Sequence, residues 1–186
     1  MQWFLFHLPG DIAGQFLFIG DSLIEFFNWQ KRFPGKKIYN FGSAGETAEG
    51  LLARLSHIMK RCEPPDLVMI MTGTNNIAME DYGFLFTYEK IIDLLQKNFP
   101  QATIVMTSLL PMDLFFLGET VPRVNRRLRD IAKKKSIVYL DLYPLFLGKD
   151  SKPIETYYEV DGVHLSERGY ETWVRALEDT VLPFLD

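Results

Sequence analysis

Short, continuous apolar runs alternate along this chain with longer segments in which apolar residues recur every three to four positions. An unbroken short run is typical of a parallel β-strand covered on both faces, and the longer period is typical of a helix that buries one side. Alternating strands and helices predict a parallel sheet between two helical layers. The expected strands cover residues 16–19, 37–41, 67–72, 103–108 and 137–142.

The helical segments are recognised by apolar residues spaced so that they lie on one face of a helix. Leu51, Leu55 and Ile58, for example, share one helical face. The same period recurs in segments 91–95, 124–135 and 170–181, the last with Ser166 as its expected N-cap. With roughly 150 residues per domain as a guide, we expect one α/β domain over residues 1–186, a three-layer α/β/α sandwich around a five-stranded parallel sheet.

The charge balance limits the classes of partner. The chain carries 24 Asp and Glu against 20 Lys and Arg, a net charge of −4, which argues against nucleic acid or an anionic membrane as its main partner. No apolar run reaches the ~18 residues of a membrane-spanning helix. Residues 1–6 lack the basic start of a secretory signal. We therefore expect a cytoplasmic protein without stable membrane insertion.

Cysteine and histidine are too few and too scattered for most metal sites. The single cysteine, Cys62, excludes an internal disulfide and a cysteine-rich metal centre, and is interpreted as a small apolar residue near a helix end. His7 and His57 have no acidic partner at a useful spacing, and we expect both to be structural or on the surface. No metal or organic cofactor is expected.

A serine follows the first expected strand, where the chain should pass into a helix. Ser22, after Gly20 and Asp21, would lie near free helical N–H groups that favour developing negative charge. The alternative is that Ser22 or Asp21 only caps the helix. Ser43 lacks the Gly-x-Ser-x-Gly spacing, and we interpret it with Glu46 as a capping box.

An acid–base pair precedes the last expected helix. Asp161 and His164 are three positions apart, so that on a turn both side chains point the same way. The carboxylate can then accept a hydrogen bond from one imidazole nitrogen, which leaves the other to take a proton from a nucleophile. Gly45 and Asn75, after the second and third strands, have the properties of oxyanion donors, a backbone N–H that can be approached closely and a side-chain amide. Each of these motifs alone is common in proteins. A nucleophile, two oxyanion donors and an acid–base pair at successive strand ends would seldom occur together by chance.

At this point the sequence resembles the GDSL, or SGNH, hydrolases. Segments 18–23 (FIGDSL), 40–47 (NFGSAGET), 73–76 (GTNN) and 161–165 (DGVHL) look like the four blocks of that family, in its order and spacing. The resemblance implies a flavodoxin-like SGNH fold with Ser22 as nucleophile, His164 as base and Asp161 as its orienting partner. It also implies an oxyanion hole formed by the Ser22 amide, Gly45 and Asn75.

The leading hypothesis is a serine esterase that cleaves small-molecule carboxylic esters through an acyl-enzyme. The alternative is a non-catalytic flavodoxin-like module that binds a phosphorylated or sugar ligand at its glycine-rich turns, although neither common glycine-rich phosphate motif is present. The apolar residues Met112, Phe115 and Phe116 either line an acyl pocket or belong to a packed helix or subunit contact. The acyl length and the oligomeric state stay open.

Overall fold

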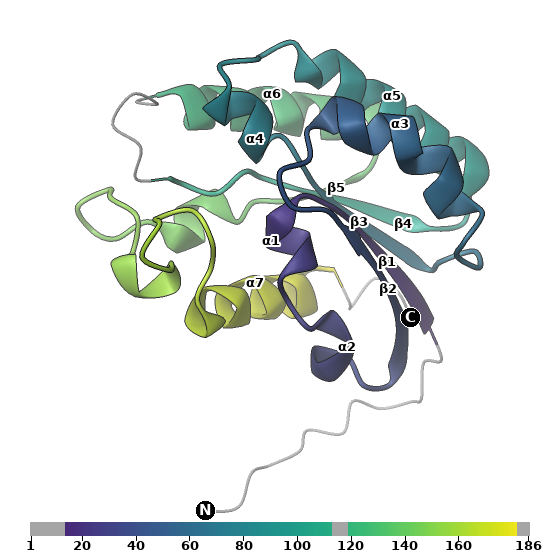
Figure 1. Cartoon of the computed structure of the whole chain (residues 1–186), viewed down its shortest axis with the longest axis horizontal. Coiled ribbons are helices and arrows are strands. Elements are labelled where there is room, and N and C mark those ends of the chain that lie inside the picture. The colour runs from purple at the N-terminus through teal and green to yellow at the C-terminus, as the bar shows by residue number, and fades with distance from the viewer. Residues whose placement is uncertain (1–13, 113–118, 182–186) are drawn as a thin grey trace, which may run out of the picture.

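Five parallel strands form the centre of the molecule in the computed structural model, which describes residues 14–112 and 119–181. The strand order is β2-β1-β3-β4-β5 (Figure 1), and every neighbouring pair is parallel. The predicted five-stranded parallel sheet is therefore confirmed. The strands are β1 (Gly14–Gly20), β2 (Lys36–Gly42), β3 (Leu67–Met71), β4 (Thr103–Thr107) and β5 (Val138–Leu140).

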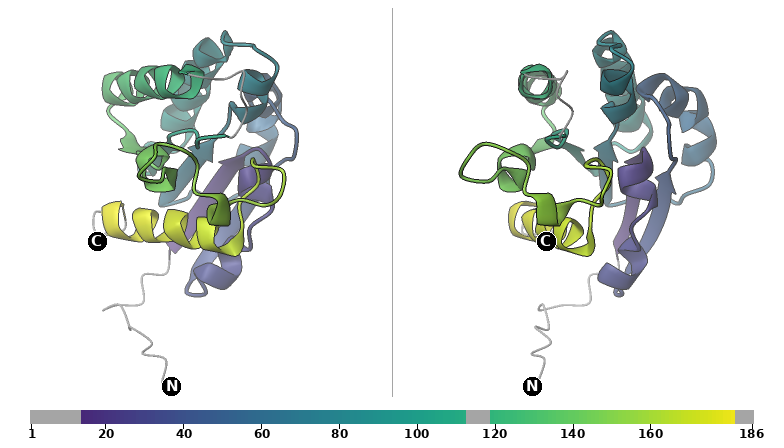
Figure 2. Two further views of the ribbon diagram at one scale, coloured as in Figure 1. Left: turned by 90° about the vertical axis from the view of Figure 1, so that its left-hand side faces the viewer. Right: turned by 60° about the vertical axis from the view of Figure 1, so that its left-hand side comes forward.

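Helices cover both faces of the sheet, as Figure 2 shows. One layer contains α3 (Ala48–Met59), α5 (Phe84–Asn98) and α6 (Thr120–Lys135), with the short α4 (Thr74–Ala78) beside it. The other contains α1 (Ser22–Glu25), α2 (Trp29–Arg32) and α7 (Glu167–Thr180). Two short 3-10 helices, η1 (Tyr143–Phe146) and η2 (Glu155–Tyr157), lie between β5 and α7.

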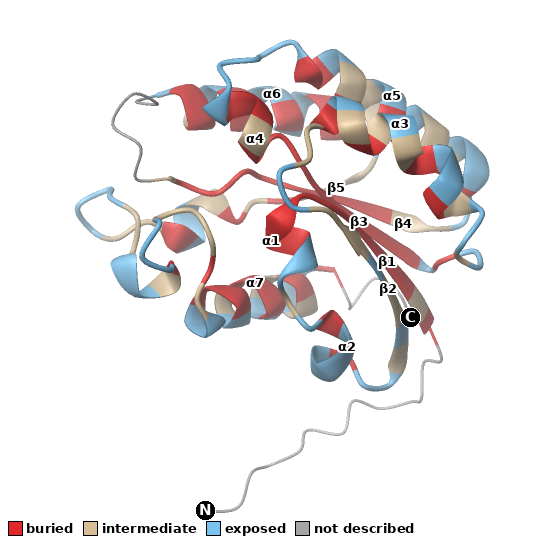
Figure 3. Cartoon of the chain, in the orientation of Figure 1, coloured by how far each residue is buried: buried red, intermediate tan, exposed pale blue. Residues whose placement is uncertain are grey.

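The core has two halves because strand side chains alternate between the faces of the sheet. In β1, Leu17 and Ile19 pack toward α3 and α5, whereas Phe16 and Phe18 pack toward α2 and α7. All five residues of β3 are buried. Figure 3 shows the buried colour concentrated on the central strands and on the inner helix faces.

The edge strand β2 departs from the expectation of a strand covered on both faces. None of its residues is buried, because β2 pairs with β1 alone within the described ranges. Its Tyr39 and Phe41 are half-buried against the core, and this is enough to produce a short apolar run in the sequence.

Of the two helix caps predicted from the sequence, the structure confirms one and contradicts the other. Ser166 caps α7, and its hydroxyl accepts a hydrogen bond from the Gly169 N–H, as expected. The capping box of Ser43 and Glu46 is wrong. Thr47 caps α3 and accepts from the Gly50 N–H, whereas the Glu46 carboxylate is engaged by Arg54, so Glu46 lies in the turn before the helix.

Cys62 and His57 lie away from the strand ends described below. Cys62 is half-buried just after α3, and burial raises the pKa of its thiol. His57 is exposed in the last turn of α3. His7 lies outside the described residues.

Gly20 makes the turn from β1 into α1 possible. Its φ is +151°, a conformation that side chains rarely adopt, and a Cβ there would lie 1.8 Å from the carbonyl oxygen of Met71. The Asp21 N–H donates to that same carbonyl oxygen. The backbone therefore leaves the sheet so close to β3 that only glycine can occupy position 20.

In the described part of the chain, no helix is both long and apolar enough to cross a membrane.

Candidate active site

Ser22 is the first residue of α1, directly after the carboxyl end of β1. The neighbouring Asp21 is the N-cap, and its Oδ1 accepts a hydrogen bond of 3.1 Å from the Leu23 N–H. The question left open by the sequence is thus answered by the local geometry. Asp21 performs the capping, and the Ser22 hydroxyl is available for another contact.

That contact is with His164, which lies 142 positions later. The Nε2 of His164 is 2.9 Å from the Oγ of Ser22, and its Nδ1 is 2.5 Å from the Oδ2 of Asp161. The three side chains predicted from the sequence therefore form one continuous chain of hydrogen bonds.

Asp161 is held in its ionised form. Its hydrogen bond with His164, and then the N–H groups of Val163 and His164, lower the pKa of Asp161 to about 2. Both of these N–H groups donate to Oδ1 at 2.9 Å, while Oδ2 contacts the imidazole. The carboxylate is thereby fixed in orientation although its side chain is half exposed.

The segment that bears Asp161 and His164 is a tight turn before α7, not part of the helix. Tyr158 and Leu165 form an antiparallel bridge, the Glu159 N–H donates to the His164 carbonyl at 2.8 Å, and Gly162 closes the turn with φ +68°. The Tyr158 hydroxyl, in addition, donates to the Pro111 carbonyl at 2.7 Å. In Figure 1 this turn lies beside α1.

The proposed oxyanion donors lie on the two neighbouring strand ends. Gly45, in the turn between β2 and α3, has φ +74°, and Asn75 is in the first turn of α4, directly after β3. Within the described ranges, the N–H groups of Ser22 and Gly45 have no hydrogen-bond acceptor. One amide hydrogen of Asn75 is donated to the Glu46 carbonyl at 2.9 Å, which leaves the second for another acceptor.

The turn around Gly45 is anchored by residues that sequence reasoning missed. Glu25, at the end of α1, accepts from the Ala44 N–H at 2.5 Å. Arg54 of α3 binds both carboxylate oxygens of Glu46, at 2.5 and 2.6 Å, and also the Phe41 carbonyl at 2.7 Å. Together with the hydrogen bond from Asn75 of α4 to the Glu46 carbonyl, these contacts link α1, α3 and α4 through the turn, so the position of the Gly45 N–H is fixed from several directions.

Two other features near Ser22 were not predicted, the complete burial of Asp21 and the position of Phe26. Asp21 is completely buried, and desolvation, partly offset by the hydrogen bond from the Leu23 N–H, raises the pKa of Asp21 to about 6. Phe26 follows α1, and its ring centroid is 5.2 Å from that of His164. Asp21 stands in the GDSL segment, so its position was a signal, whereas nothing in the sequence marks Phe26.

The predicted acyl-pocket residues are only partly described. Met112 is half-buried and packs against the core on the α3, α5 and α6 side of the sheet. Phe115 and Phe116 lie outside the described residues. The choice between a pocket and a packing segment therefore stays a prediction.

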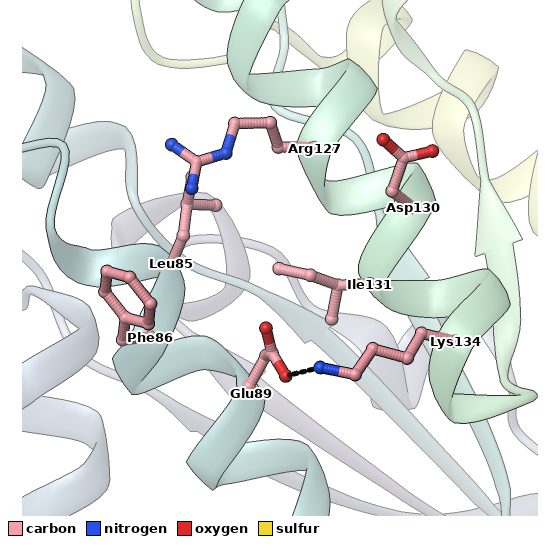
Figure 4. Close-up of a pocket in the computed structure, with 7 residues that line it drawn as sticks. All are labelled: Leu85, Phe86, Glu89, Arg127, Asp130, Ile131 and Lys134. Atoms are coloured by element: carbon pink, nitrogen blue, oxygen red, sulfur yellow. Dashed lines mark hydrogen bonds and ion pairs between the residues drawn. The ribbon is translucent and has the colours of Figure 1, made fainter.

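A groove elsewhere on the molecule is separate from Ser22. It lies between α5 and α6, on the sheet face opposite α1, and Figure 4 shows its side chains. Lys134 crosses it to Glu89, with 2.7 Å between Nζ and Oε2. Its lining contains neither a serine nor a histidine: Leu85, Phe86, Glu89, Arg127, Asp130, Ile131 and Lys134. Nor do His, Cys, Asp and Glu side chains in residues 14–112 and 119–181 form a group of three that could hold a metal ion.

Comparison with known proteins agrees with the geometry around Ser22. The sequence model of the GDSL-like Lipase/Acylhydrolase family matches residues 18–172. The chain belongs to this family. The resemblance of the four sequence segments is thus confirmed, and the comparisons give no support to the non-catalytic binding module.

Individual relatives of this GDSL-like chain include hydrolases with different names. Platelet-activating factor acetylhydrolase IB subunit alpha1 of Bos taurus is 30% identical over 182 residues, covering 94% of this chain and 78% of the relative. A solved GDSL-like lipase from Bacteroides thetaiotaomicron has a TM-score of 0.73 at 21% identity, over 92% of this chain and 89% of that one. An acetylxylan esterase from Geobacillus stearothermophilus has a TM-score of 0.72 at 21% identity, over 91% and 95%. The two structures show the shared fold.

Proposed function

We propose that this GDSL-like hydrolase is a serine esterase in which Ser22, His164 and Asp161 form the catalytic triad. The observation that supports it best is the continuous chain of hydrogen bonds from Asp161 through His164 to Ser22. Such a chain is the arrangement by which a base activates a hydroxyl nucleophile.

In the first half-reaction, Ser22 Oγ attacks the ester carbonyl carbon while His164 Nε2 accepts the hydroxyl proton. Asp161 stays ionised because its pKa is about 2, so it holds the imidazole and stabilises the imidazolium. The imidazolium then protonates the leaving alcohol oxygen, and the acyl group remains on Ser22. In the second half-reaction, water attacks this acyl-enzyme with His164 again as base, which releases the carboxylic acid and restores Ser22.

The negative oxygen of each tetrahedral intermediate is proposed to lie between the N–H groups of Ser22 and Gly45 and the free amide hydrogen of Asn75. Support comes from the unpaired state of these donors among the described residues and from the anchored turn around Gly45. Donors fixed in advance need no reorganisation during the reaction, which is the main source of their effect.

Acetyl esters are the first substrates to test, because the 30% identical relative is named as an acetylhydrolase. The unmodified chain should hydrolyse p-nitrophenyl acetate and should be labelled by a fluorophosphonate, a reagent that reacts with activated serines. A series of p-nitrophenyl esters with lengthening acyl chains then measures acyl preference, and activity should persist in EDTA because no step uses a metal.

Ser22→Ala should abolish both hydrolysis and labelling while the folded structure is retained, since the side chain is small and lies at the first turn of α1. Ser56→Ala, on the exposed face of α3, is the matched control and should behave as the unmodified chain. Turnover or labelling that survives Ser22→Ala would identify another nucleophile and refute the proposal.

A further inference from the structure

Phe26 is a large aromatic side chain that remains 57% exposed next to His164. Its N–H donates to the Ser22 carbonyl at 2.9 Å, so the backbone of Phe26 is tied to that of the proposed nucleophile. Its ring centroid is 5.2 Å from that of the imidazole, with 41° between the ring planes. One part of the ring therefore contacts His164, and the rest is available to another molecule.

The proposed reaction determines which part of an ester lies near His164. The imidazolium must deliver its proton to the alcohol oxygen, so that oxygen has to come within hydrogen-bond reach of Nε2. The carbonyl oxygen lies instead toward Gly45 and Asn75, and the acyl chain takes the remaining direction from the carbonyl carbon. The alcohol part of the substrate thus leaves the reacting centre on the side of His164, where Phe26 lies.

We infer that Phe26 is a specificity-determining residue that binds the alcohol part of the substrate. This inference rests on the proposed function. A ring next to the leaving oxygen favours alcohols that carry an aromatic or extended apolar group, since these can stack on Phe26 and cover its exposed surface. Esters of small alcohols are too short to gain this contact.

The contact should affect only one half-reaction. kcat/KM contains the steps up to and including release of the alcohol, whereas hydrolysis of the acyl-enzyme takes place after the alcohol has left. Loss of the Phe26 ring should therefore lower kcat/KM for esters with large apolar alcohols and leave the deacylation rate unchanged.

The test uses ethyl, hexyl and 2-phenylethyl acetate, which share one acyl group and have unconjugated alkoxide leaving groups. Phe26→Ala should lower kcat/KM for 2-phenylethyl acetate roughly tenfold, the upper range for one aromatic pair, and for ethyl acetate less than about twofold. Phe26→Leu should retain most of the rate on hexyl acetate. Deacylation is measured after an acylation burst with p-nitrophenyl acetate. Phe86→Ala, which removes a 70% exposed ring from α5, is the matched control and should change none of these rates.

Two outcomes would overturn the inference while leaving the esterase proposal intact. An equal loss on all three acetates, together with slower deacylation, would mean that Phe26 only supports the imidazole. Unchanged rates on all three acetates would mean that the ring does not meet the substrate. If the unmodified chain neither hydrolyses an ester nor reacts with a fluorophosphonate, the proposed function fails and this inference fails with it.

Discussion

Two adjacent asparagines in α4 allow the catalytic and structural contributions of one short helix to be separated. The side chain of Asn75 makes one hydrogen bond, 2.9 Å long, to the Glu46 carbonyl and has one amide hydrogen free. Asn76 is fully buried. Its Oδ1 accepts from the Ala48 N–H at 3.0 Å, and its Nδ2 donates to Glu49 at 2.8 Å and to Asp81 at 2.9 Å.

Asn75→Ala should affect turnover far more than stability. The lost hydrogen bond to Glu46 costs about 1 kcal/mol, which for a chain of this size lowers Tm by roughly 2–4 °C. Loss of one oxyanion donor should lower kcat by roughly 10²–10³, equivalent to about 2.7–4 kcal/mol of transition-state stabilisation.

Asn76→Ala should show the opposite pattern. It removes three hydrogen bonds and leaves a buried N–H and two carboxylates without that partner, which should cost roughly 2–5 kcal/mol of unfolding free energy. The folded fraction should keep a kcat within a few fold of the unmodified chain.

The assay is kcat and KM on p-nitrophenyl acetate for both variants, with thermal unfolding followed in the same buffer. A KM effect without a kcat effect in Asn75→Ala would mean that Asn75 binds the ground state and does not meet the oxyanion. Similar losses of kcat in both variants would mean that the integrity of α4, and not the Asn75 amide, is what matters.

Two further predictions concern ionised carboxylates. The pKa of Asp21 is about 6 in the folded chain against an ordinary 3.8, so the folded state binds this proton more tightly than the unfolded state, and stability falls as pH rises from about 4 to 6. Asp21→Asn keeps an N-cap and should raise the unfolding free energy at pH 8 by on the order of 2–3 kcal/mol, with little change at pH 4. Urea titrations of both proteins measure this, and the same difference in unfolding free energy at pH 4 and pH 8 would contradict the prediction. Asp161→Asn should lower kcat by up to roughly 10⁴-fold through loss of imidazole orientation, as steady-state kinetics would measure. Because the pKa of Asp161 is lowered to about 2, its ionised form stabilises the fold above pH 3.8, so the variant should lose less stability than the unmodified chain between pH 4 and 2.

The sequence was most informative where local pattern and chemistry coincide. Strands β1, β3 and β4 could be predicted because buried parallel strands are continuous apolar runs, and β2 and β5 because their half-buried residues still form short apolar runs. The sequence also singled out Ser22, Asp161 and His164, whose side chains the structure brings together, because each stands at a strand end or turn with a recognisable neighbour. The short helices α2 and α4 were not predicted, and α1 was expected only as a helix start after the first strand, without a range, since four or five residues show no helical period.

The anchors of the site could not be predicted for a different reason. The Glu25 carboxylate accepts a hydrogen bond from the Ala44 N–H, 19 positions away. The Phe26 ring contacts the imidazole of His164, which lies much later in the chain, in the turn before α7. Such pairs are created by the packing of α1 against the end of β2 and against the turn before α7, and neither residue carries a local signal. The correction at Glu46 has the same origin, because its partner Arg54 lies two turns into α3.

The 142 positions between Ser22 and His164 have a consequence for how the protein is made. During synthesis β1 and α1 emerge long before the turn that carries the base, so on the proposed mechanism the nascent chain holds an unactivated serine until the turn with His164 docks beside α1. Reaction of Ser22 with a fluorophosphonate then reports when the turn that carries His164 has docked beside α1. On stalled chains of increasing length, it should appear only after α7, which anchors the turn through Ser166 and the Tyr157 carbonyl, has left the ribosome.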